Sequence, residues 1–237
     1  MAAFSTSARR GAALVVSTVG LAVTLAACGG GSSSADHSSM PGSGTAAASG
    51  APAAQPSGST SGMAGMNSYP PITPGPAASG AHNDTDVMFA NDMIPHHGQA
   101  VQMADMILAK TSNPDVKALA ERIKAAQTPE VVTMAGWLKG WGETVPDPYA
   151  HSAGMTGMEH SGMMSDEQMN QLDKASGAQA DKVFLTQMQE HHAGAIDMAK
   201  TELAQGSNPE AKKLAGSIST SQTAEIAEMK AIAAKLG

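Results

Sequence analysis

The chain contains an internal repeat, and this repeat limits its possible folds more than any other feature. When the sequence is shifted by 95 positions, residues 89–134 align with residues 184–229 without a gap. About twenty of the aligned positions are identical, and a doubled histidine recurs in both copies. A duplication of this kind predicts that each copy forms the same unit and that the two units pack together.

Each copy has the sequence pattern of two helices. Strong helix formers predominate, β-branched residues are sparse, and apolar residues recur three and four positions apart. An asparagine, or the serine before it, can cap the second helix, with Pro114 or Pro209 at the first helical position. Two helical hairpins, at about 84–141 and 179–236, predict an all-α antiparallel four-helix bundle with approximate two-fold symmetry.

Two prolines lie inside these predicted helices. Pro95 falls in the first helix and Pro129 in the second, where each removes a backbone hydrogen bond. Their counterparts in the second copy, Glu190 and Ala224, are ordinary helix residues. We therefore expect a local kink at each proline rather than a helix end.

The first 81 residues have the composition of an export signal followed by a tether. Residues 1–27 place two arginines before a short apolar run that ends in small residues, and the segment resembles a bacterial lipoprotein signal peptide. Cleavage would leave Cys28, the only cysteine, as a lipidated N-terminus; a free thiol is the alternative. Residues 28–81, rich in Gly, Ser, Ala and Pro, predict a disordered tether with a span of roughly 40 Å. We expect the domain, residues 82–237, to be held by this lipid at the outer face of the bacterial cytoplasmic membrane.

The chain is acidic, with a formal net charge of −7. Removing the signal peptide takes away two arginines and makes the mature chain more negative. Nucleic acid is therefore not an expected partner, whereas cations are favoured.

Histidine and methionine occur together in a pattern that indicates a metal site. In each copy the doubled histidine follows one methionine and precedes another, and helical periodicity places these side chains on one broad face. Methionine and buried histidine also serve as ordinary core residues, but buried imidazoles need polar partners. The candidate ligands are Met93, His96, His97 and Met103 in the first copy and Met188, His191, His192 and Met198 in the second.

The connection between the repeats, at about 147–165, has similar chemistry. It is rich in Gly, Ser, Met and His, and a flexible loop has no core that methionine could fill. A low-complexity linker is the alternative. A short extra helix is predicted to begin at Ser165. The candidate ligands in the loop are His151, Met155, Met158, His160 and Met163.

The ligand types favour copper. Thioether and imidazole together suit copper, and Cu(I) above all, whereas catalytic zinc takes histidine with carboxylate or thiolate. Neither HExxH nor a Glu-x-x-His motif accompanies the doubled histidines, so the di-iron carboxylate pattern is missing. Glu130 and Glu225 occupy matching positions, either as surface charges or as hydrogen-bond partners of the histidines.

Two segments resemble the bacterial DUF305 family, and the resemblance extends over residues 82–237. They are HNDTDVMFANDMIPHHGQAVQMA at 82–104 and SGAQADKVFLTQMQEHHAGAIDMA at 176–199. The resemblance implies a ferritin-like four-helix bundle in an exported or lipid-anchored protein, in a family with members linked to copper binding. The family pattern falls on the eight His and Met residues of the two copies.

The leading hypothesis is an extracytoplasmic lipoprotein that sequesters copper or passes it on, with another copper-handling protein as the candidate partner. One alternative is a ferritin-like metal oxidase or oxidoreductase, against which the missing Glu-x-x-His motifs argue. The other is a structural or interaction lipoprotein whose His and Met side chains are core. The sequence does not decide whether the chain is an enzyme, and it favours a binding role.

Overall fold

The structure, a computed structural model, describes residues 69–149 and 162–237. In these residues it contains five helices and no strands, which confirms the all-α prediction. None of the described helices is long and apolar enough to cross a membrane. Several predictions fall outside the described residues, namely those for the signal peptide at 1–27, Cys28, the tether up to residue 68, His151, Met155, Met158 and His160.

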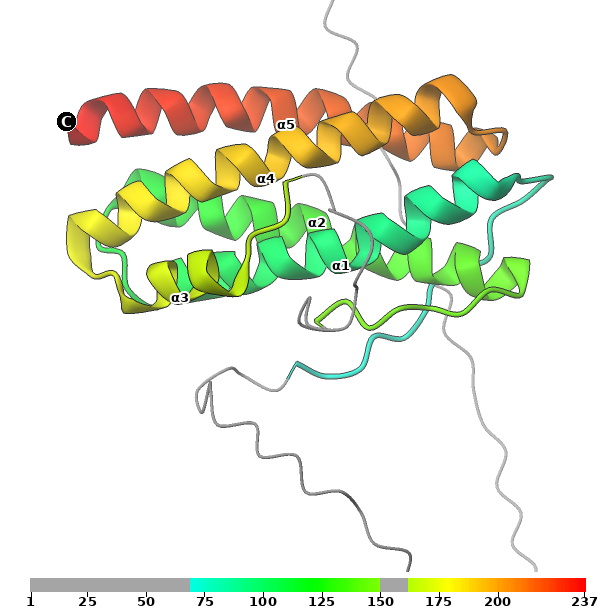
Figure 1. The fold of residues 1–237 in the computed structure, drawn as a ribbon, viewed down its shortest axis with the longest axis horizontal. Helices are drawn as coiled ribbons and strands as arrows, with labels where there is room; N and C mark the ends of the chain where they lie inside the picture. Colours follow the sequence, from blue (N-terminus) through cyan, green and yellow to red (C-terminus); the bar gives the residue numbers. More distant parts are fainter. Residues whose placement is uncertain (1–68, 150–161) are drawn as a thin grey trace, which may run out of the picture. The chain divides into compact units, whose positions relative to one another are not determined.

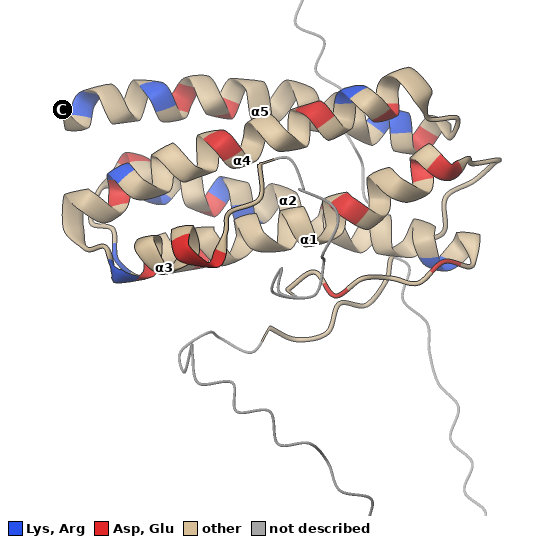
Figure 2. Ribbon diagram, in the orientation of Figure 1, with Lys and Arg blue, Asp and Glu red and all other residues tan. Residues whose placement is uncertain are grey.

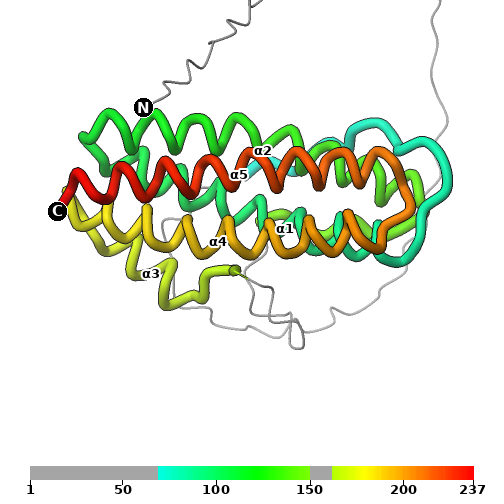
Figure 3. The backbone as a smooth tube through the Cα atoms, turned by 90° about the horizontal axis from the view of Figure 1, so that it is seen from above, coloured from blue at the N-terminus to red at the C-terminus, as the bar shows by residue number. Residues whose placement is uncertain are grey.

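Four long helices form the bundle. They are α1 (Asp84–Leu108), α2 (Pro114–Trp141), α4 (Gly177–Gln205) and α5 (Pro209–Leu236), with the short α3 (Asp166–Lys174) in the connection. Figure 1 shows α1 and α2 as one antiparallel hairpin and α4 and α5 as the other. The main contact between the hairpins is made by α1 and α4, and α3 contacts both of these helices; Figure 3 shows the same arrangement from above. The predicted bundle of two duplicated hairpins is confirmed.

Matching caps begin the second helix of each hairpin. The Asn113 side chain accepts hydrogen bonds from the first backbone amides of α2, and the Asn208 side chain does the same for α5. Pro114 and Pro209 follow at the first helical positions, as predicted. Asparagine rather than the preceding serine is therefore the cap, and each such cap stabilises its helix by about 1 kcal/mol.

Both internal prolines lie within unbroken helices. α1 continues through Pro95 and α2 through Pro129, which confirms that neither proline ends its helix. The local kinks stay a prediction.

The hydrophobic core divides into two clusters along the bundle. The first cluster includes Met103 and Met188 together with residues of α3, and the second includes Met93 and Ala195. Along both α1 and α4, the doubled histidine lies between residues of one cluster and residues of the other. The histidines therefore form a polar layer within an otherwise apolar core.

The packed chain begins earlier than the sequence suggested. Residues 69–81, assigned above to a disordered tether, are held by several helices. Gly75 N donates to Val132 O of α2 at 2.8 Å, and the carbonyls of Ser79 and Ala81 accept from the Asn208 side chain at the start of α5. Gly136 permits this approach, since a Cβ there would overlap the carbonyl oxygens of Gly75 and Pro76. The boundary at residue 82 is therefore too late. The sequence of residues 69–81 has no helical or strand periodicity. It therefore does not indicate that this segment packs on α2 beside Gly136.

Candidate metal centre

Four imidazoles form a row across the contact between α1 and α4. His96 and His191 lie at its middle, with ring centroids 3.7 Å apart and planes inclined by 38°. His97 lies 6.5 Å from His96 on one side, and His192 lies 6.3 Å from His191 on the other. All four side chains are fully buried. We call this row the histidine layer.

A glutamate holds the outer histidine on each side of the layer. His97 Nε2 lies 2.7 Å from Glu130 Oε2 of α2, and His192 Nε2 lies 2.7 Å from Glu225 Oε2 of α5. The sequence left the role of these glutamates open, and the structure identifies them as histidine partners. A proton shared with the carboxylate at Nε2 leaves Nδ1 with the lone pair that a metal ion needs.

The Nδ1 atoms of His97 and His192 are the best-placed metal donors. Both atoms are buried, and no group among the described residues forms a hydrogen bond with either. A buried polar atom without a partner costs about 1–3 kcal/mol, which coordination to a metal would offset. The histidine layer therefore fits a metal that accepts imidazole nitrogen.

The protonation state also suits coordination. Burial lowers the pKa of His191 well below its usual value, and the neighbouring His96, His192 and His97 lower it further. His191 is consequently neutral at neutral pH, and neutral imidazole is the form that binds metals.

The candidate methionines flank the layer from both sides. Met103 and Met188 are fully buried in the first core cluster. Met93 is fully buried in the second cluster, against which the partly buried Met198 packs. Each cluster thus combines a methionine from α1 with one from α4. The eight predicted His and Met residues of the repeats are thus found in the histidine layer and in the two core clusters that adjoin it.

Nitrogen and carboxylate donors alone do not complete a site here. Within residues 69–149 and 162–237, no three His, Cys, Asp or Glu side chains gather closely enough to hold a metal ion. The rings of His96 and His191 are also too close for an ion to lie between them, since each nitrogen would be about 2 Å from the ion. A metal at the outer histidines would therefore take thioether ligands beside the imidazole nitrogens.

The connection between the hairpins is anchored beside the histidine layer at both of its described ends. The carbonyl of Pro148 packs on Gly98, where an added Cβ would overlap it. Gly162, at φ +83°, packs on α4, where a Cβ would lie 2.7 Å from Glu190 O and 2.9 Å from Gly194 Cα. Sequence reasoning missed these anchors. The available signal was a glycine next to or near each doubled histidine.

Met163, the predicted loop ligand that the structure describes, follows Gly162 directly. Its side chain is partly exposed, whereas that of Met164 is buried in the first core cluster. Of these two neighbours, the structure therefore places Met164, which was not among the candidate ligands, with Met103 and Met188.

The charged residues of α1 are all acidic. In Figure 2 this helix has acidic residues, in red, and no basic ones, whereas α2, α4 and α5 contain residues of both signs. A negative field of this kind favours the approach of cations and disfavours anions.

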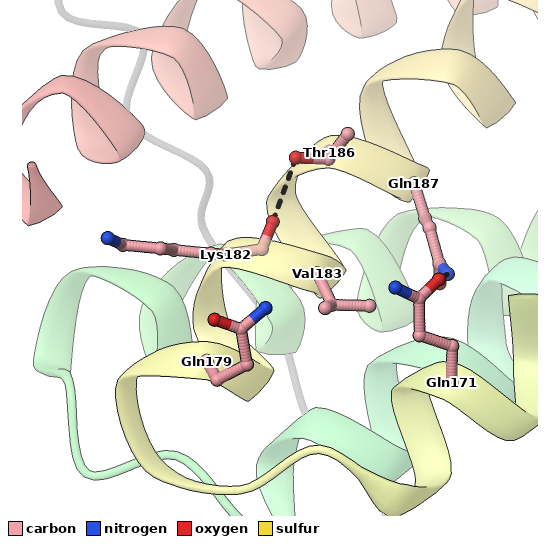
Figure 4. A pocket seen from close by; sticks show the side chains of 6 residues that line it. All are labelled: Gln171, Gln179, Lys182, Val183, Thr186 and Gln187. Carbon is pink, nitrogen blue, oxygen red and sulfur yellow. Dashed lines mark hydrogen bonds between the residues drawn. The ribbon is translucent and has the colours of Figure 1, made fainter.

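A surface pocket occurs between α3 and α4, and none of the candidate ligands lines it. Its volume is about 220 Å³, and Figure 4 shows amide side chains, a lysine and a threonine around it. The Thr186 hydroxyl donates to the carbonyl of Lys182 at 2.9 Å. The lining residues are Gln171, Gln179, Lys182, Val183, Thr186 and Gln187.

Comparisons with known proteins agree with the fold. A DUF305 protein of Streptomyces coelicolor that is thought to be secreted is 35% identical, with a TM-score of 0.57 over 65% of this chain and 92% of its own. CopM in its Cu(II)-bound form is 33% identical, with a TM-score of 0.55 over 64% of this chain and 97% of its own. In its Cu(I)-bound form CopM is 33% identical, with a TM-score of 0.51, 62% coverage of this chain and 94% of its own.

No curated protein sequence matches the chain. The family model described as "Domain of unknown function (DUF305)" matches residues 86–233, which is more than half of the chain. The chain therefore belongs to the DUF305 family.

Proposed function

We propose that this protein binds copper outside the cytoplasm and either sequesters it or passes it on, with the histidine layer as the principal site. One observation carries the proposal: two buried imidazoles, each fixed by a glutamate, keep Nδ1 without a partner among the described residues. Flanking methionines supply the thioethers that would complete the coordination. The similarity to CopM, which has been solved with Cu(I) and with Cu(II), supports copper as the ion.

Cu(I) is the favoured oxidation state. Imidazole nitrogen accepts both copper ions, whereas thioether sulfur is a soft donor that prefers Cu(I). Methionines contribute as many candidate ligands in the two repeats as histidines do. The site should therefore bind Cu(I) more tightly than Cu(II) or Zn(II).

Residues of the connection are proposed as additional ligands. His151, Met155, Met158 and His160 lie between the anchors at Pro148 and Gly162, which pack beside the histidine layer. Together with Met163 they would capture copper and pass it to the buried histidines. An acceptor for released copper would be another copper-handling protein.

The location of the protein is part of the proposal. A lipid on Cys28 would hold the domain at the outer face of the bacterial cytoplasmic membrane, and the similar Streptomyces coelicolor protein, which is thought to be secreted, supports export. The Cys28→Ala variant should move from the membrane fraction to the soluble fraction. Retention of this variant in the membrane fraction would show that another element anchors the chain.

The histidine layer can be tested directly by replacing all four of its histidines with alanine. We expect tight copper binding to disappear in competition titrations while circular dichroism still reports a helical protein. His82→Ala is the matched control, since His82 stacks on Trp141 at 4.6 Å and belongs to no candidate site. Copper affinity equal to that of the parent in the fourfold variant would refute the site.

The two alternatives give different results in the same experiments. A metal oxidase would oxidise Cu(I) or Fe(II) in steady state faster than a buffer control. A structural lipoprotein would purify without metal and would show the same thermal stability with and without copper. The proposed function predicts neither outcome.

A further inference from the structure

Residues 162–164 cross from α4 to α1 beside the histidine layer. At one end Gly162 packs on the backbone of α4. At the other end Gln99 of α1 holds Met164: Gln99 Oε1 accepts from Met164 N at 2.7 Å, and Gln99 Nε2 donates to Met164 O at 2.8 Å. Figure 1 shows this segment leading from α4 towards the start of α3. The segment is thus fixed at both ends next to the histidines.

The two hydrogen bonds from Gln99 to Met164 have no equivalent in the second copy of the repeat. Gln99 follows the first doubled histidine by two positions, and its counterpart in the second copy is Gly194. In the first copy an amide holds the crossing segment, and in the second a glycine lets it approach. Gln99 is only 7% exposed, and both of its hydrogen bonds are buried. Its two bonds therefore define the position of one short segment accurately.

This position brings a thioether from the connection to one side of the histidine layer, held by a residue that follows His97 by two positions. Met164 is 3% exposed and belongs to the same core cluster as Met103 and Met188. On the other side of the layer, Met93 and Met198 have no described counterpart of Met164 from the connection. Methionines are divided unequally between the two clusters: the first holds Met103, Met164, Met169, Met188 and Met229, and the second holds Met93 and Met134 with the partly buried Met198 packed against it.

We propose that Met164 is a thioether ligand of the copper site and that Gln99 is the positioning residue that holds it there. The inference rests on the proposed copper binding. It places the bound copper on the side of the histidine layer next to the first core cluster. An additional thioether favours Cu(I) and Ag(I), which are soft ions, and adds little for Cu(II). The side of the layer that faces Met103, Met164 and Met188 is then the tighter Cu(I) side.

The Met164→Leu variant tests the ligand, because leucine keeps the apolar volume and removes the sulfur. We expect Cu(I) affinity to fall by about tenfold in a chelator competition titration, with Cu(II) affinity unchanged. X-ray absorption at the copper edge should show one sulfur neighbour fewer than in the parent. Met169→Leu is the matched control, since Met169 is 5% exposed in the same core cluster but lies on α3.

The Gln99→Leu variant tests the positioning role. It removes both hydrogen bonds to the backbone of Met164, and all of the candidate copper ligands remain unchanged. We expect the same loss of one sulfur neighbour and a fall in Cu(I) affinity of about tenfold, as for other residues that orient ligands. Gln99→Glu, whose carboxyl can accept and donate as the amide does when it is protonated, should restore the sulfur neighbour at a pH at which the parent still binds Cu(I).

Two results would overturn the inference. One is a Met164→Leu variant with the sulfur count and Cu(I) affinity of the parent. The other is an equal loss in Met164→Leu and Met169→Leu, which would indicate a general packing effect. With either result, the histidine layer is still supported as the copper site if the fourfold histidine variant has lost copper binding. Retention of copper by the histidine variant would instead refute the proposed function.

Discussion

The imidazole of His97 and the carboxylate of Glu130 are 2.7 Å apart at their nearest atoms, and the duplication repeats this relationship with His192 and Glu225. The two residues of each pair are 33 positions apart in both copies. Each glutamate is only partly exposed, so the contact is little screened by water. A carboxylate in this position fixes the imidazole tautomer and makes the other ring nitrogen a better metal donor.

The glutamates should therefore affect copper affinity without contacting the ion. We expect a combined Glu130→Gln and Glu225→Gln variant to bind copper about 10–100-fold more weakly, because an amide orients and polarises the imidazole less well. Competition titration measures the change. Glu121→Gln, an exposed glutamate of the same helix α2, is the control and should match the parent. Parental affinity in the combined variant would mean that the glutamates only satisfy buried histidines.

Gly98 should be intolerant of any side chain. A Cβ at this position would overlap the carbonyl of Pro148, so Gly98→Ala must displace the start of the connection. We expect the free energy of unfolding to fall by about 1–3 kcal/mol in urea titrations, despite the helix propensity of alanine.

Gly216→Ala is a matched comparison within helix α5. Here the nearest atom, Leu203 Cδ2, would be 3.9 Å from the new Cβ, an ordinary contact. Only the gain in helix propensity remains, and we expect stabilisation by about 0.5–1 kcal/mol. Opposite signs for the two substitutions would identify the contact with Pro148 as the cause. Equal effects would contradict the close approach.

The buried carboxyl of Glu202 should make stability depend on pH. Burial, followed by the hydrogen bond and charge of Asp86, raises the pKa of Glu202 from 4.5 to about 8, although Lys212 opposes this. Between these two values the folded chain binds more protons than the unfolded chain. The contribution of Glu202 is therefore complete below pH 4.5 and is lost as the pH rises through about 8.

Asp86 has the opposite pH dependence. Burial acts to raise the pKa of Asp86, but hydrogen bonds from the backbone of Asn83, Asn208 and Ser207 and from the Glu202 side chain outweigh this and lower it to about 2. Asp86 is ionised in both states above pH 5 and adds no slope there.

Urea unfolding between pH 7 and pH 9 isolates the contribution of Glu202, because its pKa of about 8 lies in this range. The opposite pH dependence of His191, whose pKa is lowered from 6.5, lies below this range. We expect the parent to lose stability as the pH rises, and Glu202→Gln, whose amide resembles the protonated carboxyl, to lose less. The same slope in both proteins would assign the pH dependence to other groups.

The sequence predicted the parts of the fold that depend on local pattern. The offset of 95 positions, the helical periodicity and the Asn-Pro pairs were enough for two hairpins and their caps. The connection was not predictable in this way. Its anchors at Gly98, Gln99 and Gly194 are single positions at which the copies differ, and their meaning depends on a segment distant in sequence.

The candidate site was predicted as far as it depends on local helical spacing. The part that depends on contacts with distant segments could not be predicted. Helical spacing placed the doubled histidines and their methionines on one face, but it could not show which histidine faces its glutamate. It could not show that Met164 rather than Met163 is the buried residue, because loop residues carry no periodicity from which burial can be read. The side chain that the structure buries depends on how Gln99 holds the backbone.

Copper should stabilise the folded chain by an amount that grows with the logarithm of its affinity. A ligand that binds only the native state raises the free energy of unfolding by about 2.7 kcal/mol at a hundredfold excess over its dissociation constant. We expect Cu(I), or Ag(I) as a redox-stable substitute, to raise the unfolding temperature of the parent. The fourfold histidine variant should show no such shift, because the imidazoles that hold the ion are absent. Equal shifts in both proteins would place the stabilising ion outside the histidine layer, and no shift in the parent would favour a purely structural role for the histidines and methionines.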